Sequence, residues 1–286
     1  MHMFQVGSTD PSGGSLNFSE GGQQGGRNWC TCDQCTYAGA WCGQNQDPPD
    51  NNDTRLISGT WLVENVLDEL DVPGEFFLDR HTGLLYLFPN ATDTNTTHGS
   101  GTSAGGSAAS DSSHFPDLRL AVLESLIEVR GSDISPVEGV HIEGLGFRDT
   151  AATFLGNWSA PSGGDWALHR GGAVFLEAAR NVTIRQCRFR RLDTNAVFLS
   201  RFTRDVVVER SAFEWIGESA VATWGETKGF DATEGLQPQG TVIQDNLMRE
   251  LGILQKQSSG VGQAKAALTT IRRNGRFTCM AFTCDG

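Results

Sequence analysis

A short pattern of apolar and polar residues occurs three times, without gaps, in the second half of the chain. The copies are residues 181–192, 205–216 and 240–251. Each begins with two apolar residues separated by one polar residue, which is the period of a strand with one buried face. Like residues coincide in the three copies, namely Val182, Val206 and Thr241; Ile184, Val208 and Ile243; Phe189, Phe213 and Met248; Leu192, Ile216 and Leu251. Because one such unit cannot bury its apolar face alone, the repeat predicts a stack of copies with one continuous core.

Shorter segments extend this pattern in both directions. Residues 139–147 form an earlier copy, and residues 268–274 form a later copy that loses the pattern. Each corner after the first strand has a small or turn-prone residue that can bond the backbone, namely Cys187, Ser211, Asn246 and Asn274. Second apolar runs accompany the copies at residues 173–176, 196–199, 220–224 and 252–254, and residues 126–129 supply the first strand. The unit is too short for a strand, a helix and another strand, so the sequence predicts a solenoid of strands.

Residues 126–277 resemble the right-handed parallel β-helix of the pectin-lyase-like superfamily. Stretches at 161–166, 215–218, 224–225 and 256–259 are similar to those of large extracellular proteins in its right-handed β-helix branch. The resemblance implies an all-β fold in which residues 118–278 form a right-handed parallel β-helix. It implies little about chemistry, because this fold hosts lyases, hydrolases, isomerases and inert adhesins.

The predicted solenoid is preceded by three segments. Residues 1–54 are rich in Gly, Ser, Asn and Gln and lack periodicity, so we expect an irregular segment. Residues 55–90 predict a helix at 61–70, from its apolar stripe, and a β-hairpin whose turn is 80–83. By resemblance, this small helix plus β-hairpin caps the solenoid or docks on it. We interpret Asp79, Arg80 and His81 as turn residues and not as a catalytic set. Residues 91–117 predict a Ser/Thr/Gly linker.

The last copy of the repeat ends abnormally. Arg276 stands where Phe or Met is expected, and residues 279–286 form an irregular tail without capping features. An uncapped last coil leaves an open strand edge, which natural solenoids avoid. We therefore expect the chain to be a fragment or an altered gene product, which leaves both an active and an inactive protein open and favours association.

Composition narrows the class of partner. The formal net charge of −12 argues against nucleic acid, which requires a basic face, but leaves glycans open. No apolar run is long enough for a transmembrane helix, and the first residues lack the regions of a signal peptide. Glycosylation sequons favour a secreted or cell-surface protein, although a chain rich in Ser and Thr also generates them by chance. The sequons begin at Asn17, Asn52, Asn90, Asn95, Asn157 and Asn181.

Four cysteines near the N-terminus suggest a covalent or metal-bound cluster. They are Cys30, Cys32, Cys35 and Cys42. Their spacing lacks the paired C-x2-C knuckles of structural zinc sites. In a chain with many sequons, two local disulfides are therefore favoured over zinc. We predict no metal site and no cofactor.

Two interruptions of the repeat are candidate binding loops, because solenoids place such loops where copies are expanded. They are residues 149–172 and 225–240. If residues 173–176 are the counterpart of 196–199, the first loop enters that strand stack and the second leaves it. The two loops would then wall opposite sides of one groove. A rival register makes residues 151–155 the strand and moves the first loop to the other side, and the sequence leaves both open.

Candidate catalytic residues lie at the corner before this strand stack. Asp193 and Glu218 occur there on adjacent coils. The strand spacing of about 4.8 Å would bring their carboxylates within about 5 to 9 Å, the range of paired carboxylates in glycoside hydrolases. His169 in the first loop is the candidate general base. The alternatives are solvated corner carboxylates and a structural histidine.

Candidate substrate-binding residues come from the loops. Trp166 and Trp224 could stack on sugar rings, although core packing also explains Trp224. Lys256 could neutralise a uronate or deprotonate a sugar carbon, and Asp165 and Glu226 accompany these residues in the loops. The catalytic runs of polygalacturonases and common pectate lyases are missing. The sequence thus favours a secreted carbohydrate-active protein, a glycoside hydrolase or a polysaccharide lyase, over a non-catalytic glycan-binding or structural protein. Its oligomeric state stays open.

Overall fold

The computed structural model describes residues 4–10, 12, 14–21, 63–89, 118, 120–156, 158–159, 167–228, 231–255 and 258–279. The chain divides into two compact units, residues 1–48 with 121–286, and residues 49–120. Among the described residues, no helix is long and apolar enough to cross a membrane. The described parts are almost entirely β, as the sequence predicted.

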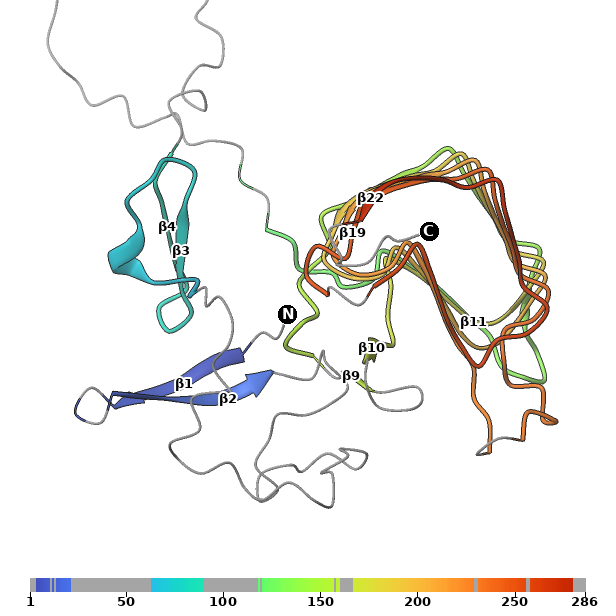
Figure 1. Ribbon diagram of the computed structural model, residues 1–286, viewed down its shortest axis with the longest axis horizontal. Helices are drawn as coiled ribbons and strands as arrows, with labels where there is room; N and C mark the ends of the chain where they lie inside the picture. The colour runs from blue at the N-terminus through green and yellow to red at the C-terminus, as the bar shows by residue number, and fades with distance from the viewer. Residues whose placement is uncertain are drawn as a thin grey trace, which may run out of the picture. The chain divides into compact units, whose positions relative to one another are not determined.

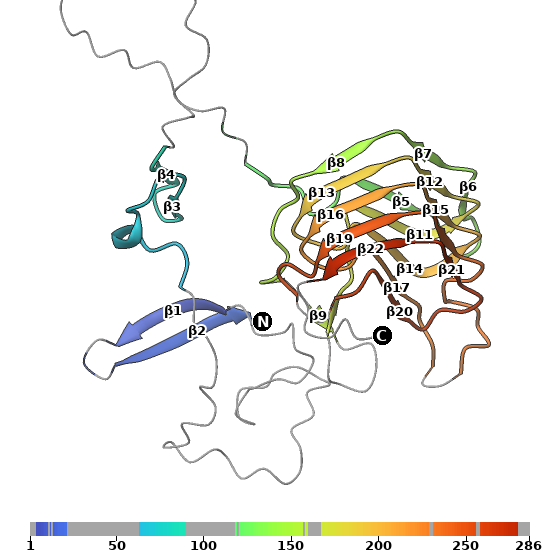
Figure 2. The same cartoon turned by 45° about the horizontal axis from the view of Figure 1, so that its top comes forward.

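From residue 127 the chain winds in successive coils, and each coil gives one strand to each of three parallel sheets (Figures 1 and 2). The first sheet contains β5 (Ile127–Arg130), β11 (Val174–Arg180), β14 (Val197–Arg204), β17 (Val221–Trp224) and β20 (Val261–Ala264), with β6 (Val137–Glu138) beside β11. The second contains β7 (His141–Glu143), β12 (Thr183–Arg185), β15 (Val207–Glu209), β18 (Val242–Gln244) and β21 (Thr270–Arg272). The third contains β8 (Gly146–Arg148), β13 (Arg188–Leu192), β16 (Ala212–Ile216), β19 (Leu247–Leu251) and β22 (Gly275–Cys279).

The strand register confirms the alignment of the sequence copies. Ile184 pairs with Val208, which pairs with Ile243, and the same ladder extends outward to Ile142 and Ile271. The equivalent positions of the third sheet pair in the same way across β8, β13, β16 and β19. The side chains of like residues therefore lie above one another and fill a single continuous core.

Aromatic rings stack inside this core. The ring centroid of Phe189 lies 4.8 Å from those of both Phe147 and Phe213, with interplanar angles of 13° and 4°. Phe189 is completely buried. The identical spacing follows from the strand separation, since a residue in the same position of each coil is displaced by one strand.

Two devices turn the chain at the corners. Residues with positive φ recur between the second and third sheets, at Gln186, Arg210, Asp245 and Arg273. Next to them runs a ladder of polar side chains: Ser211 Oγ accepts from the Cys187 amide, and Asn246 Oδ1 accepts from the Ser211 amide. Asn274 Oδ1 accepts from the Asn246 amide in turn. The predicted role of these residues at corners is confirmed.

The strands settle the open register and correct one assignment. Val174 pairs with Val197, so residues 173–176 are the counterpart of 196–199. Residues 151–155 form no strand, and the rival register was wrong. The strand that follows β17 in this stack is β20, and not residues 252–254. The backbone of residues 252–255 instead folds back onto the preceding coil, where the amides of Leu254 and Gln255 donate to the oxygen of Gly217.

The unit of residues 49–120 contains the predicted hairpin but not the predicted helix. Strands β3 (Phe76–Asp79) and β4 (Leu84–Leu87) pair antiparallel, and Asp79 accepts hydrogen bonds from the His81 amide and the Thr82 hydroxyl at the turn. Of the helix expected at 61–70, the described part holds only a 3-10 turn, Leu67–Glu69. Asn65 explains the difference, because its φ is 60° and its side chain bonds the backbone of Leu78 twice. The residue is thus fixed out of the helical conformation.

The first segment also departs from the prediction. Strands β1 (Phe4–Asp10) and β2 (Ser15–Gly21) form an antiparallel hairpin where we expected irregular structure. Its turn is stabilised by Asp10, whose carboxylate accepts hydrogen bonds from the amide and hydroxyl of Ser12. Each strand has one apolar–polar–apolar step, Phe4 to Val6 or Leu16 to Phe18, which is too short to predict a strand within a segment rich in Gly and Ser.

Candidate functional site

The corner between the third and first sheets holds a buried carboxyl group. Glu218 follows β16 and is only 1% exposed. Thr153 Oγ1 lies 3.0 Å from its Oε1, and Asn195 Nδ2 donates to its Oε2 over 2.6 Å. Burial raises the pKa of Glu218 well above its usual range, and the hydrogen bonds from these two neutral side chains offset this only in part.

The hydrogen-bond pattern agrees with a protonated Glu218. Thr153 Oγ1 is 3.0 Å from the backbone oxygen of Asp193 as well as from Glu218 Oε1. A hydroxyl has one hydrogen and donates to only one of these acceptors. When Glu218 carries a proton on Oε1, it donates to Thr153 Oγ1, and Thr153 donates to Asp193. Every group in the chain of hydrogen bonds is then satisfied, so the geometry favours the neutral acid.

Two aspartates lie at the same corner of the two preceding coils. Asp193 is half-buried, and its amide donates to Thr150 Oγ1 over 2.9 Å. Burial and the charge of Asp149 raise the pKa of Asp193 above its usual value. Nε and Nη2 of Arg191 donate to the two carboxylate oxygens of Asp149, over 2.9 and 3.1 Å. One carboxyl of this pair is thus favoured as an acid while the other is ion-paired.

His169, in β10 (Leu168–His169), reaches the same corner. This strand pairs with β9 (Trp158–Ser159) within the loop of residues 149–172. Nδ1 of His169 lies 3.8 Å from Oε1 of Glu218 and 3.5 Å from Oγ1 of Thr194. Burial lowers the pKa of His169 to about 4, so the imidazole is neutral at pH 7 and is a weaker base than an exposed histidine. The structure therefore brings Asp193, Glu218 and His169 to one corner.

Trp224 lies on the outer face of the first sheet and is mostly covered. It is 9% exposed. The guanidinium of Arg170 lies 4.2 Å from the centre of its ring and donates to the oxygen of Trp224 and to Ser200 Oγ. Because one ring face is occupied by Arg170, this arrangement favours the packing role over sugar stacking.

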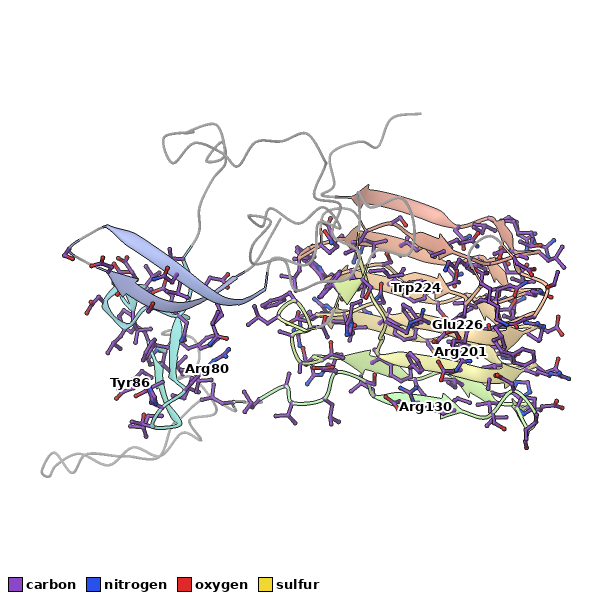
Figure 3. The ribbon with its side chains drawn as sticks, turned by 90° about the horizontal axis from the view of Figure 1, so that it is seen from below. Arg80, Tyr86, Arg130, Arg201, Trp224 and Glu226 are labelled. Atoms are coloured by element: carbon purple, nitrogen blue, oxygen red, sulfur yellow. The ribbon has the colours of Figure 1, made fainter. Side chains whose placement is uncertain are left out.

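Charged pairs cross the same outer face. Glu226 is exposed after β17 and pairs with Arg201 Nε over 2.6 Å. Figure 3 shows Trp224, Glu226, Arg201 and Arg130 along one side of the coil. The loop of residues 149–172 leads into β11 of this sheet, and the loop of 225–240 follows β17. The groove between these loops stays a prediction.

Several predicted site residues lie outside the described part of the chain. They are Asp165, Trp166 and Lys256, the cysteines Cys30, Cys32, Cys35 and Cys42, and the sequon residues Asn52, Asn90, Asn95 and Asn157. The other two sequon residues, Asn17 and Asn181, are exposed. Glycosylation and disulfide formation remain predictions.

The sequence did not indicate the residues that hold the corner together. Thr153, Asn195 and Arg170 act through contacts between the loop and the coils, which no periodic pattern encodes. The glycine at position 171 is the one sequence feature that could have indicated this contact. An added Cβ there would lie 2.5 Å from the His169 ring. The pair of glycines at 171 and 172 thus marks the close return of the loop to the coil.

Comparisons with known proteins support the fold. No protein-family model matches the chain. No curated protein matches it either. It is similar to a solved structure described as "Glycoside hydrolase", with a TM-score of 0.51 and 18% sequence identity. The match covers 70% of this chain and 36% of that chain, so this protein spans little more than a third of the other. At this identity the likeness shows a shared fold and nothing finer.

Proposed function

We propose that this protein is a secreted, carbohydrate-active, right-handed parallel β-helix of the pectin-lyase-like kind that acts as a glycoside hydrolase on a polysaccharide or glycan. The observation that carries the proposal is the corner where half-buried Asp193, ion-paired Asp149 and buried Glu218 lie on successive coils. Glycoside hydrolysis uses two carboxyl groups with opposite tasks. The fold similarity to a chain described as a glycoside hydrolase is compatible with this assignment.

Asp193 is the proposed general acid. Its raised pKa keeps the carboxyl protonated closer to neutral pH, which general acid catalysis requires, and its side chain is only half-buried. Asp149, held as a carboxylate by Arg191, is the proposed base or nucleophile.

Glu218 is better suited to positioning than to attack. A nucleophile must be ionised and accessible, whereas Glu218 is enclosed and its burial favours the protonated form. Through Thr153 it fixes the backbone of Asp193. Nδ1 of His169 lies 3.8 Å from Oε1 of Glu218, and the neutral ring is proposed to line the corner as a hydrogen-bonding group.

Incubation with a panel of polysaccharides, with assay of new reducing ends and of unsaturated products, tests the proposal. We expect wild type to release reducing ends and Asp193→Asn to lose about 100-fold or more of the rate. Asp133→Asn is the matched control. Asp133 is exposed, and its ion pair with Arg201 is loose at 3.8 Å, so its loss should change little. Full activity of Asp193→Asn would exclude the assignment, and unsaturated products would indicate a lyase.

A non-catalytic glycan-binding protein is the second candidate. The observation that favours it is the enclosure of Glu218, with both carboxyl oxygens occupied and 1% of the residue exposed. Retention of a glycan from the same panel without any cleavage would support this candidate over the first.

Secretion is tested on native material. Asn181 is exposed at a corner of the coil and is a suitable acceptor for glycosylation. We expect endoglycosidase treatment to lower the mass of the protein, and Asn181→Gln to remove part of that change. An unchanged mass would contradict secretion through a glycosylating pathway.

A further inference from the structure

The outer face of the third sheet is rich in arginine. Arg148, Arg190, Glu214 and Arg249 are paired in register across β8, β13, β16 and β19, and Arg188 lies on the same face of β13. Figure 2 shows these strands side by side. The side chains of Arg148, Arg188 and Arg249 are 54%, 60% and 46% exposed. We call this surface the arginine face.

The central carboxylate of the arginine face is already neutralised. Glu214 pairs with Arg188 over 2.9 Å and with Arg249 over 2.5 Å, and its side chain is only 5% exposed. The hydrogen bond from Arg188 is the main reason that the pKa of Glu214 lies below its usual value, so the group is ionised. One buried negative charge therefore holds two exposed guanidinium groups in place.

The remaining arginines outnumber the carboxylates that pair with them. Arg148 and Arg190 are directly opposite each other, where like charges are unfavourable at a strand spacing of about 4.8 Å. Arg148 shares Asp149 with Arg191. Among the described residues, Arg190 has no ion-pair partner and is exposed. Counting Arg191, five arginines face three carboxylates, namely Asp149, Glu214 and Glu250.

This local excess of positive charge contrasts with the chain as a whole. The protein has 34 acidic and 22 basic residues and a formal charge of −12. An exposed aromatic residue, Trp215, follows Glu214 in β16 and is 45% exposed. Guanidinium forks suit planar anionic groups, and an indole ring suits the apolar face of a sugar.

We propose that the arginine face binds an anionic polysaccharide that carries sulfate or carboxylate groups. Repeated anionic groups along the polymer would contact the arginines of successive coils, and Trp215 would contact a sugar ring. This surface adjoins the proposed catalytic corner, because Asp149 pairs with both Arg148 and Arg191. Arg190 forms no ion pair with Asp149 among the described residues, so substitutions there distinguish binding from cleavage. The acidic remainder of the chain disfavours nucleic acid as the partner.

Equilibrium binding of the full chain to four probes, at low and high sodium chloride, tests the proposal. The probes are a heparin oligosaccharide, a polygalacturonate oligosaccharide, dextran and a short DNA duplex. We expect at least one anionic glycan to bind at low salt and to weaken as salt rises, and dextran to bind less tightly than either. The two anionic glycans distinguish sulfate from carboxylate.

Charge reversal locates the site. Arg190→Glu should weaken glycan binding at least about tenfold, with Arg190→Gln intermediate. Arg180→Glu is the matched control, because Arg180 is 45% exposed and its contact with Glu138 is 3.7 Å, and its effect should stay within about twofold. Arg190→Gln decides the question if the reversed variant does not fold.

Three results would overturn the proposal. The first is the absence of binding to both anionic glycans at low salt. The second is an equal loss of glycan affinity in Arg180→Glu and Arg190→Glu, and the third is DNA binding as tight as glycan binding. Loss of glycan binding in Arg190→Glu with unchanged cleavage of the polysaccharide panel would support the arginine face independently of the catalytic corner.

Discussion

The hydroxyl of Thr153 lies 3.0 Å from Oε1 of Glu218, although the two residues are 65 positions apart in the chain. Thr153 belongs to the loop of residues 149–172, and Glu218 belongs to the corner between two sheets of the coil. Both residues are buried. The contact therefore fastens the loop to the coil at the proposed catalytic corner.

Replacement of Thr153 by Val should destabilise the protein. The change keeps the shape of the side chain but leaves Oε1 of Glu218 and the oxygen of Asp193 without this partner. A buried polar group without a partner costs about 1 to 3 kcal/mol of unfolding free energy. Urea denaturation followed by circular dichroism measures the loss.

Thr241→Val is the control for this substitution. Thr241 is completely buried, and its hydroxyl has no hydrogen-bond partner within the described residues. It occupies the position of Val182 and Val206 in the earlier coils, so Val restores the pattern. We expect unchanged or greater stability, by up to about 1 kcal/mol. Equal losses in both variants would mean that the contact with Glu218 contributes nothing specific.

Glu218→Gln should change the pH dependence of stability. A carboxyl whose folded pKa is raised stabilises the fold below its unfolded pKa of 4.5, and this contribution is lost as pH rises through the folded pKa. Glutamine resembles the neutral acid, because its amide can donate to Thr153 while its oxygen accepts from Asn195. Wild type should therefore lose stability above pH 4.5 relative to the variant. Urea denaturation at several pH values measures this. If the unfolding free energy changed equally with pH in both proteins, a protonated Glu218 would be contradicted.

His169 should produce a pH effect of opposite sign. Burial lowers its pKa from 6.5 to about 4, so the folded state binds fewer protons than the unfolded state between these values. Its stabilising contribution, on the order of 3 kcal/mol, is present above pH 6.5 and lost as pH falls through about 4. His169→Gln should remove this acid sensitivity, whereas His141→Gln, at an exposed position of β7, should retain it. Acid unfolding that is identical in the two variants would rule out His169 as its source.

The core of the coil could be predicted from the sequence because like residues lie above one another. Val208 has Ile184 on one side and Ile243 on the other, so an alignment of sequence copies is also an alignment of strands. The same logic failed for residues 252–254, where an apolar run at the expected distance belongs to a turn and the strand comes later. Apolar content alone does not separate these cases.

The candidate site could be predicted only in part. The position of Asp193 and Glu218 on adjacent coils follows from the repeat, but Thr153, whose hydroxyl contacts both residues, comes from the inserted loop. Thr153 reaches Glu218, and Arg170 covers Trp224, through a loop path that has no counterpart in the other coils. The sequence alone therefore does not distinguish a solvated carboxylate from a buried, protonated carboxyl group.

Gly225→Ala should be strongly destabilising. An added Cβ would lie 2.1 Å from the backbone oxygen of Lys265 and 2.6 Å from Cβ of Gln237, so backbone must move to admit it. Overpacking of this kind costs about 1 to 3 kcal/mol, and more when backbone is displaced. Thermal and urea unfolding measure the effect. Because Gly225 begins the loop that carries Glu226, displacement should also alter the ion pair between Glu226 and Arg201.

Gly146→Ala provides the matched comparison, at a position in another coil of the same stack. An added Cβ at Gly146 in β8 meets no atom within 4 Å, and the residue does not have the positive φ that would strain alanine. Alanine there should leave stability within about 0.5 kcal/mol of wild type or raise it slightly, because it reduces the freedom of the unfolded chain. If Gly225→Ala were as stable as Gly146→Ala, the backbone around Lys265 and Gln237 would have to be less closely packed than this structure has it, and the loop that follows β17 would not be fixed by that contact.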